Sequence, residues 1–480
     1  MKRPYLILAL LALILPTLLR VAWFYRGTPD RAEIPTPDYA SFTRPEVTVN
    51  QPNLDDVPQL KGTVLLDGYH ANQFYLNEIE SLTASILARG GNVETVTDSY
   101  SFETQLKYAS AFISISPGLS FSTYEAQLLK TFTERGGRIL VLTDATRNAI
   151  YFDYFSGNPV AASDATAANS LLKHFDISIN NDYLYNTSSN EGNFRNVFFG
   201  EFAKNELTFG LDTVALYGAH SVESPSGMVL LKGEETNLSS ANDAHNSNAG
   251  GAALSADGNV AAFGDLTFLS SPYSTYNDNA ALIQNLADFV LSGERSQTLD
   301  VYPFIFASDT VKVYISPNIQ KTPTLVTAMA ALQNSMRYLD ITVEFVDELP
   351  SSGDVILVGT FDDAAEDLNS LRKIGVEIDS ETINSIEFGE ISRFGNGLVL
   401  FETGSKGNRL ALLADTTEDL LTLMGVAGGG SLTSCLTSAQ VAVCSVGFGD
   451  YGFDTGETFE ETPVDAIEET DPEATPTPSG

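Results

Sequence analysis

Cysteine, tryptophan, histidine and methionine are all scarce in this sequence of 480 residues, which has two Cys, one Trp, four His and five Met. Basic residues are also few. There are 26 Lys and Arg against 62 Asp and Glu, so the formal charge at pH 7 is −36. Because this charge repels the phosphates of nucleic acid and no basic stripe interrupts it, we expect no nucleic-acid partner. The excess of acid is typical of an exposed protein that is kept soluble by its charge.

Several motifs that carry chemistry are missing as well. The sequence has no Gly-x-x-x-x-Gly-Lys phosphate loop, no Gly-x-Ser-x-Gly nucleophile turn and no His-Glu-x-x-His zinc motif. The histidines also lack the spacing of metal ligands. We therefore predict no cofactor and no metal site, and these absences count against an enzyme.

The N-terminus contains the longest apolar run. Lys2 and Arg3 precede 22 residues, Pro4 to Tyr25, of which only Thr17 and Arg20 are polar. As a helix this run spans about 33 Å, enough to cross a bilayer core of about 30 Å. It lacks the small-x-small site of a cleavable signal peptide and ends in three aromatic residues typical of a membrane interface. We predict an uncleaved transmembrane signal anchor over residues 1–26.

Two features favour a location of the body outside the cytoplasm, although Arg26 and Arg31 follow the span and weaken its charge asymmetry. The lone pair Cys435 and Cys444 suits a disulfide in an oxidising compartment. Two buried free thiols are the alternative. The C-terminal tail is rich in Pro, Thr and Glu, as in surface-exposed stalks. We predict a single-pass protein of the cell membrane with an extracytoplasmic body.

The pattern of the chain predicts an α/β protein with several parts. They are an extended linker at 27–60, a doubly wound, mostly parallel α/β domain at 61–295, a second and smaller α/β domain at 299–428, a cysteine-pair segment at 429–450 and a disordered acidic Pro/Thr tail at 451–480.

Strands and helices alternate in both predicted domains, which indicates parallel sheets covered on both faces. In the first domain we expect strands at 63–67, 93–96, 111–116, 138–143, 214–217, 228–231 and 260–263, and helices at 77–89, 101–108, 124–135 and 279–292. In the second domain we expect strands at 311–315, 341–346, 355–358, 398–401 and 410–414, and helices at 324–338, 364–374 and 417–424.

Six polar residues follow predicted strands of the first domain and form a candidate ligand pocket. They are Asp67, His70, Asn72, Asp144, Arg147 and Asp265. Ligands of open α/β sheets bind at the carboxyl ends of the strands, where these residues are expected. Two plainer interpretations stay open. Side chains after the first strand can cap the next helix, and Asp144 with Arg147 can form a structural ion pair.

Four stretches carry a family resemblance. They read Leu-Leu-Asp-Gly-Tyr-His-Ala-Asn-Gln-Phe at 65–74, Gly-Gly-Arg-Ile-Leu-Val-Leu at 136–142, Phe-Gly-Asp-Leu-Thr-Phe-Leu at 263–269 and Asn-Asp-Asn at 277–279. Together they resemble class I glutamine-amidotransferase-like domains of the kind found in the auxiliary component of gliding-motility-type ABC transporters and in an intraflagellar-transport subunit. The resemblance covers about Lys61 to Arg295.

The resemblance implies a test of activity. In active amidotransferases a nucleophilic cysteine follows the fourth strand, and a histidine and a glutamate follow a late strand. Here the fourth strand leads into Thr143 and Asp144, residues 61–295 contain no cysteine, and no histidine adjoins Asp265. A thiolate activated by histidine is therefore missing. The resemblance implies a pseudoenzyme whose domain serves recognition or assembly.

Three functions remain as hypotheses. The leading one is a non-catalytic binding or assembly module, accessory to a transport or envelope system, that is tethered to the membrane and contacts a protein partner. The second is a sensor that binds a saccharide or peptide in the strand-end pocket. The third is a hydrolase with a carboxylate site. An exposed apolar patch would favour a protein partner, whereas an open concavity with unpaired carboxylates would favour a ligand or substrate.

Overall fold

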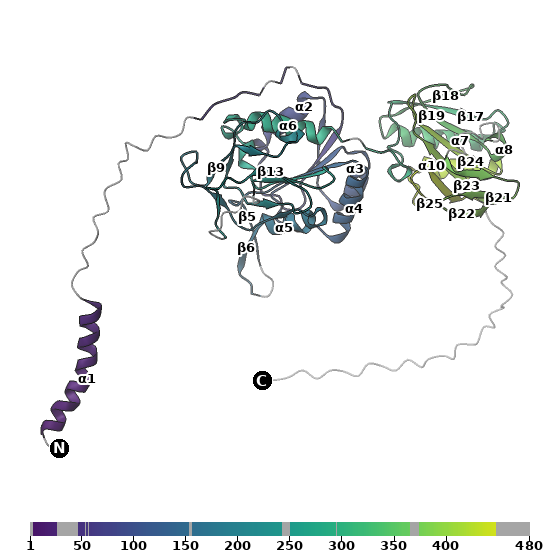
Figure 1. Ribbon diagram of the computed structural model, residues 1–480. Coiled ribbons are helices and arrows are strands. Elements are labelled where there is room, and N and C mark those ends of the chain that lie inside the picture. The colour runs from purple at the N-terminus through teal and green to yellow at the C-terminus, as the bar shows by residue number, and fades with distance from the viewer. Residues whose placement is uncertain are drawn as a thin grey trace, which may run out of the picture. The chain divides into compact units, whose positions relative to one another are not determined.

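The computed structural model confirms the predicted fold class, a mixed α/β protein with a long apolar N-terminal helix (Figure 1). It describes residues 3–25, 47–52, 54–55, 57–152, 156–241, 250–293, 295–364 and 374–447. The predicted tail at 451–480 and much of the linker at 27–60 lie outside these ranges. So do His245 and most of the predicted helix 364–374.

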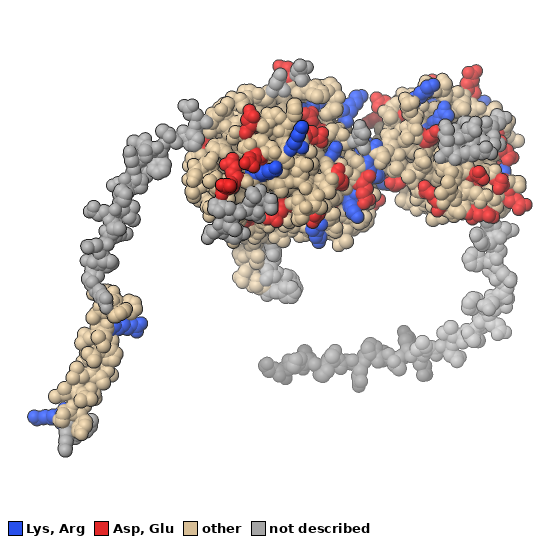
Figure 2. Space-filling view, viewed as in Figure 1, with Lys and Arg blue, Asp and Glu red and all other residues tan. Residues whose placement is uncertain are grey.

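Helix α1 (Arg3–Phe24) is 22 residues long, is apolar over most of its length, and buries none of its side chains. Its length and composition suit either a membrane anchor or a signal sequence. Figure 2 shows an apolar rod with basic side chains only toward its two ends. The helix is therefore a candidate to cross a membrane.

The first domain is built on an eight-stranded sheet whose order is β10-β13-β15-β16-β4-β3-β1-β2. The strands in that order are β10 (Glu201–Phe202), β13 (Met228–Lys232), β15 (Ala252–Leu254), β16 (Val260–Phe263), β4 (Arg138–Leu142), β3 (Ala111–Ile115), β1 (Thr63–Asp67) and β2 (Asn92–Val96). From β16 to β2 all neighbours are parallel, whereas β15, β13 and β10 join antiparallel. The carboxyl ends of five strands therefore meet at one edge.

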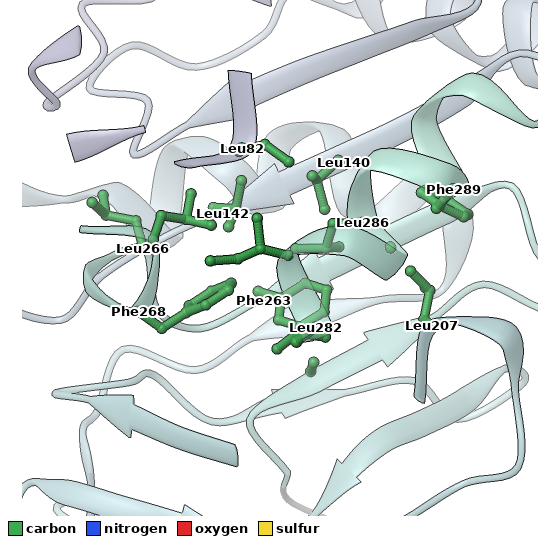
Figure 3. Packing of buried hydrophobic residues seen from close by; sticks show 14 of the residues in the cluster. Leu82, Leu140, Leu142, Leu207, Phe263, Leu266, Phe268, Leu282, Leu286 and Phe289 are labelled. Carbon is green, nitrogen blue, oxygen red and sulfur yellow. The ribbon is translucent and has the colours of Figure 1, made fainter. Parts of the chain in front are cut away.

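Alternate residues of the central strands supply two hydrophobic cores, one on each face of the sheet. Val64, Leu140 and Phe263 belong to one core, and their neighbours Leu65, Val141 and Ala262 belong to the other. Figure 3 shows the first core, in which Leu82 and Leu286 come from helices and pack beside Leu140 and Phe263. Because both faces of the central strands are covered, consecutive residues of these strands are apolar, as at 64–66 and 139–142.

Helices α2 (Glu80–Ala88) and α6 (Asn279–Leu291) contribute to the first core, and α3 (Ser99–Tyr108), α4 (Thr123–Glu134) and α5 (Asp164–Leu172) to the second. Asp98 caps α3 by accepting the N–H groups of Tyr100 and Ser101. Four of these helices were predicted. Helix α5 was not, nor was the hairpin β5 (Asn148–Phe152) and β6 (Pro159–Ser163) that precedes it.

Besides the β5–β6 hairpin, three two-stranded sheets of the first domain lie outside the large one. They pair β11 (Val214–Tyr217) with β9 (Asn196–Phe199), β12 (Val222–Glu223) with β7 (Ser178–Ile179) and β14 (Leu238–Ser239) with β8 (Leu184–Tyr185). The predicted strand 214–217 is thus real but does not extend the main sheet. Its four residues are all buried, so burial alone does not reveal which sheet a strand joins.

The second domain is also built on one large sheet of parallel and antiparallel strands. It has seven strands in the order β18-β17-β19-β24-β23-β26-β25. The strands are β18 (Thr342–Val346), β17 (Thr310–Ile315), β19 (Asp354–Thr360), β24 (Arg409–Ala414), β23 (Asn396–Glu402), β26 (Val441–Ser445) and β25 (Cys435–Thr437). The first four are parallel and the last three join antiparallel. Helices α7 (Pro323–Arg337) and α10 (Thr417–Gly428) supply side chains to its larger core.

A small antiparallel sheet of this domain was not predicted. It consists of β20 (Val376–Ile378), β21 (Thr382–Ser385) and β22 (Gly389–Ser392). Its Val376 and Ile383 are buried in a second core, together with Leu398, Leu413 and Val443 of the seven-stranded sheet. At the start of the predicted helix 364–374 the structure describes only α8 (Phe361–Ala364).

Cys435 and Cys444 form a disulfide between the paired strands β25 and β26, which confirms the predicted bond and excludes the two free thiols. The two cysteines are nine residues apart in the sequence. A disulfide that closes a loop of this size stabilises a fold by about 2–3 kcal/mol. It fixes the edge of the second sheet shortly before the described chain ends at residue 447.

The described end of the predicted linker lies on the first domain. Asn50 donates its backbone N–H to Thr275 at 2.7 Å, and Leu60 packs against the first core. The chain is therefore attached to the domain before β1 begins.

Candidate functional site

The six predicted site residues lie at or just beyond the carboxyl ends of β1, β4 and β16, as expected. Asp67, Asp144 and Asp265 have no exposed surface, and His70 is 3% exposed. Strands β1 and β4 are separated by β3, so Asp67 and Asp144 lie on strands about 10 Å apart. The structure thus divides the residues into separate polar clusters below the surface.

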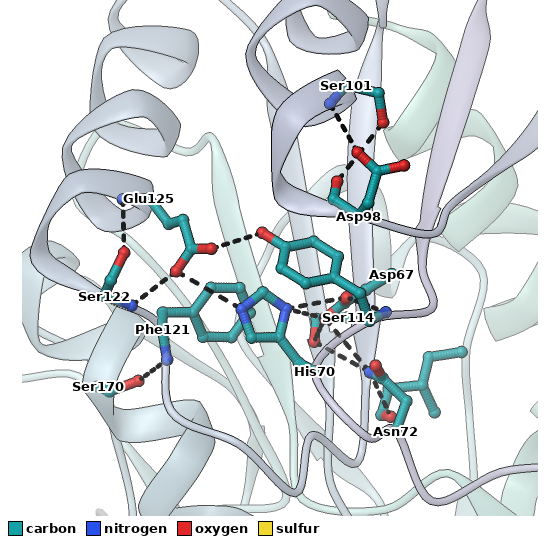
Figure 4. A network of polar contacts seen from close by, with 12 residues as sticks. Asp67, His70, Asn72, Asp98, Ser101, Ser114, Phe121, Ser122, Glu125 and Ser170 are labelled. Atoms are coloured by element: carbon teal, nitrogen blue, oxygen red, sulfur yellow. Dashed lines mark hydrogen bonds and ion pairs between the residues drawn. The ribbon is translucent and has the colours of Figure 1, made fainter.

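The first cluster is centred on Asp67 (Figure 4). Its carboxylate lies 2.9 Å from His70 Nδ1, and it accepts hydrogen bonds from Ser114 Oγ at 2.7 Å and from Asn72 Nδ2 at 3.3 Å. Asn72 also donates to the backbone carbonyl of Ile115 at 3.0 Å. Because a buried carboxylate is costly without donors, these contacts fix the loop after β1 to the neighbouring strand β3.

A second carboxylate lies on the other side of His70. The Nε2 atom of His70 is 3.7 Å from the carboxylate of Glu125. The His70 ring stacks on the Phe121 ring, with a centroid distance of 3.9 Å. Glu125 also accepts from Ser122 N–H and from the hydroxyl of Tyr69. Burial alone would raise the pKa of Glu125, but these hydrogen bonds outweigh it and lower the pKa. His70 is therefore held between two carboxylates and an aromatic ring.

A further cluster, which the sequence did not indicate, is centred on Asp164 at the start of α5. This carboxylate accepts from Ser116 Oγ at 2.7 Å and from the Asp144 N–H at 2.8 Å, and it lies 3.0 Å from His220 Nε2. Burial lowers the pKa of His220, but the hydrogen bond and the charge of Asp164 more than offset this and leave the pKa raised. Asp164 is fully buried, and His220 is 2% exposed.

Both clusters contain a serine, a histidine and an aspartate, but in an order unsuited to nucleophilic catalysis. In a catalytic triad the serine donates to histidine, and the aspartate orients that histidine from its other side. Here Ser114 donates to Asp67, and Ser116 donates to Asp164. The carboxylate occupies the middle position in each cluster, so neither histidine receives the serine proton.

Asp144 and Asp265 form a close pair bridged by Thr267, whose hydroxyl donates to Asp144 and whose N–H donates to Asp265. Asp265 also accepts the N–H of Tyr217 at 2.8 Å. Burial and the charge of Asp144 together raise the pKa of Asp265 well above its ordinary value. The pKa of Asp144 is also raised, mainly by burial. A proton is therefore favoured on this pair.

The suggested ion pair between Asp144 and Arg147 is wrong. Arg147 instead forms an ion pair with Glu78 of the short helix η2 (Leu76–Glu78), and the side chain of Asp144 bonds to Thr146 and Thr267. The sequence indicated only Asp144, which is close to Arg147 in the chain, whereas Glu78 is 69 residues away and is brought close by the fold. Arg147 therefore joins the loop after β4 to the loop after β1.

Four further residues of these clusters were not predicted from the sequence, namely Ser114, Ser116, Glu125 and Asp164. One of them had a usable signal, because Ser122 and Glu125 form a capping box at the start of α4. Ser114 and Ser116 alternate with apolar residues of a buried strand and carry no mark of function. Asp164 follows a hairpin that was not predicted.

The pair of His220 and Asp164 leads to a pH-dependent prediction. Because the folded pKa of His220 is raised, its stabilisation is complete below the free-histidine pKa of about 6.5 and is lost as pH rises through the folded value. His220→Gln should therefore lower the free energy of unfolding by about 3 kcal/mol near pH 6 and by less near pH 9. Denaturant unfolding at both pH values measures this, with the exposed His174→Gln as the control. A cost that does not change with pH would contradict the charged pair.

Solved structures similar to this chain include the N-terminal domain of mmIFT52, with a TM-score of 0.38 and 17% identity over 49% of this chain and 99% of that domain. A ThuA-like protein from Bacteroides uniformis has a TM-score of 0.29 and 12% identity, covering 50% of this chain and 92% of that one. PurLQS from Thermotoga maritima has a TM-score of 0.26 and 12% identity, covering 48% and 99%. No family model and no curated protein matches the chain. The specific family named from the sequence stays a prediction.

Proposed function

We propose that this chain is a membrane-anchored, extracytoplasmic module that binds a protein partner and performs no catalysis. The partner we propose is a component of a transport or envelope system, as the resemblance of residues 61–295 implies. The observation that carries the proposal is the contrast at the carboxyl edge of the first sheet, where carboxylates are buried and aromatic side chains are exposed.

The location rests on two features. Helix α1 has the length and composition to cross a bilayer, and the sequence after it lacks a cleavage site for signal peptidase. The disulfide Cys435–Cys444 favours an oxidising compartment. An uncleaved anchor with the body outside accounts for both features.

The exposed side chains come from the segments that follow β1, β2 and β3. Leu76 is 72% exposed, Tyr100 94%, Leu119 55% and Tyr124 62%. The hydroxyl of Tyr124 donates to Glu103 of α3, so Tyr124 lies close to the helix whose first turn contains Tyr100. Aromatic side chains bring a large apolar area at a small entropic cost and are enriched at protein interfaces. We call these four residues the aromatic edge.

The absence of catalysis is supported by two further points. A nucleophile in this type of fold sits on a strained, left-handed turn after its strand. In the described part of the chain, non-glycine residues with positive φ include Ala71 and Ser116 but neither Thr143 nor Asp144. The serine hydroxyls of the two buried clusters donate to carboxylates, so no activated nucleophile is available there.

The small-ligand sensor and the hydrolase both require carboxylates that a ligand can reach. Asp67, Asp144 and Asp265 are fully buried and accept hydrogen bonds from the protein's own groups. Exposing them would require the surrounding loops to move and these bonds to break, which costs about 1–3 kcal/mol for each group left unsatisfied. Both alternatives therefore rank below the protein-binding module.

The role of the aromatic edge in binding a protein partner can be tested through the complex that the chain forms. Full-length chain extracted from its own membranes in mild detergent should migrate on a native gel as a complex with its partner. The double substitution Tyr100→Ser and Tyr124→Ser should reduce that complex at least about tenfold, because interface aromatics commonly contribute 2 kcal/mol or more. The control is Tyr338→Ser, which removes an equally exposed tyrosine, 90% exposed, from the second domain. A complex lost equally in the control, or unchanged in the double variant, would refute the aromatic edge.

The anchor predicts a defined topology. The protein should fractionate with membranes at full length, and protease added to intact cells should degrade the body. Recovery of a soluble form that starts after Tyr25 would show that α1 is a cleaved signal. A membrane-bound body that is protected from protease would reverse the orientation.

The absence of catalysis predicts that purified full-length chain releases no ammonia from glutamine beyond the buffer blank. Asp144→Ala should give the same background, because Asp144 is fully buried and accepts hydrogen bonds from Thr146 and Thr267. Ammonia release by the wild type that disappears in Asp144→Ala would establish a carboxylate enzyme and overturn this part of the proposal.

A further inference from the structure

The second domain carries a small pocket at the edge where β19 and β24 begin, opposite the edge at which open α/β sheets usually bind ligands. The cavity has a volume of about 220 Å³. Two segments line it, residues 351–353 before β19 and the turn 402–409 that joins β23 to β24. Its lining residues are Ser351, Ser352, Gly353, Glu402, Gly404, Ser405, Lys406, Gly407 and Arg409. We call it the Ser/Gly pocket.

Two cations line this pocket, although the chain has a charge of −36. Within the described residues neither Lys406 nor Arg409 forms an ion pair or a side-chain hydrogen bond, whereas Arg89, Arg147 and Arg393 are each paired with a carboxylate. Glu402 stands directly opposite Arg409 in the β23–β24 register, yet the two make no ion pair in this part of the structure. Both cations are therefore available to an anionic ligand.

Hydroxyl groups complete the donor set. Ser351, Ser352 and Ser405 line the pocket and make no side-chain hydrogen bond to other described residues. A guanidinium, an ammonium and hydroxyl groups are the donors that proteins use for phosphate and sulfate oxygens. The glycines that alternate with them keep the pocket open, because they add no side chain to it.

The turn that carries both cations is held in place by its neighbours. Gly353 donates its N–H to the carbonyl of Lys406 at 2.7 Å, and Asn408 donates its N–H to Asp354 at 2.7 Å. Gly407 has φ +125°, and a Cβ there would lie 2.3 Å from the Gly353 carbonyl, so only glycine fits. The pocket is thus formed before any ligand arrives, which reduces the entropic cost of binding.

We propose that the Ser/Gly pocket binds the oxyanion group of a phosphorylated or sulfated saccharide. Lys406 and Arg409 neutralise the oxyanion, and the serine hydroxyls donate to its oxygens. Glu402 accepts a hydrogen bond from a sugar hydroxyl, which explains a carboxylate in an anion site. The cavity is smaller than the roughly 300 Å³ typical of drug-sized ligands, so it suits a single charged sugar unit. This site lies in the second domain and does not depend on the aromatic edge.

Calorimetric titration of full-length protein in neutral detergent at low ionic strength tests the proposal. The probes are inorganic phosphate, inorganic sulfate, glucose 6-phosphate and glucose. We expect binding of the three anions and not of glucose. Arg409→Gln and Lys406→Gln should each weaken anion binding at least about tenfold, as expected for loss of a charge-assisted hydrogen bond. The two inorganic ions distinguish a preference for phosphate from one for sulfate.

Lys321→Gln is the matched control, because it removes the same charge from an exposed site of the same domain outside the pocket. An equal loss of affinity in this control would show non-specific attraction and overturn the site, as would a wild type that binds none of the three anions. Glu402→Gln tests the saccharide part. It should lower the affinity for glucose 6-phosphate relative to that for inorganic phosphate. An unchanged ratio of the two affinities would overturn the role of Glu402 in binding sugar.

Discussion

Four aspartates, Asp67, Asp144, Asp164 and Asp265, are buried at the carboxyl edge of the first sheet, and the loops around them are arranged to supply donors. A buried carboxylate without hydrogen bonds costs several kcal/mol, so each loop after β1, β3, β4 and β16 has to bring N–H or O–H groups inward. The left-handed turns at Ala71 and Ser116 belong to these loops. The polar groups at this edge therefore stabilise the domain by joining neighbouring strand ends.

This arrangement has a functional consequence. In open α/β sheets the carboxyl edge is where ligands usually bind, because strand ends and helix N-termini present polar groups there. Here those groups are used within the protein, and large apolar side chains such as Leu76 and Tyr100 occupy the surface instead. Under the proposed function, this position in the fold serves as a contact surface and not as a chemical site. The fold by itself specifies neither role, so function has to be argued from the site.

The second domain also combines parallel with antiparallel strands, but its proposed site lies at the opposite edge of its sheet. Its four parallel strands are followed by antiparallel strands that end in the disulfide hairpin, much as three antiparallel strands complete the first sheet. Asp354 at the start of β19 accepts from Ser308 and Asn408 and so fixes the turn before β24. A buried aspartate again organises loops, but here the loops leave two cations free at the surface.

Local pattern determined most of the regular structure. Apolar runs bounded by glycine gave β1, β3, β4 and β16, and helical spacing gave α2, α4, α6 and α7, because these segments bury continuous faces. Helix α5 and the sheet of β20, β21 and β22 were missed. Six of the nine residues of α5 are buried, but four of those six are Ala or Asp, so the helix has no strong apolar stripe. In β21 the two buried residues are Ile383 and Ser385, only one of which is apolar. The end of helix α4 just before Gly136 and the disulfide were also predicted from the sequence. Both depend on residues that lie close together in the chain.

The contacts of the candidate site could not be predicted in the same way. The sequence placed Asp67, Asp144 and Asp265 at one edge, since parallel strands align their carboxyl ends. It did not pair Arg147 with Glu78, or His220 with Asp164, because these partners are 69 and 56 residues apart. Nothing in the local pattern distinguishes an exposed aspartate from a buried one. The sequence by itself determined the strands, their direction and the shared edge, whereas only the tertiary structure decided which side chains meet there, because burial and long-range hydrogen bonds depend on how the loops close over the sheet.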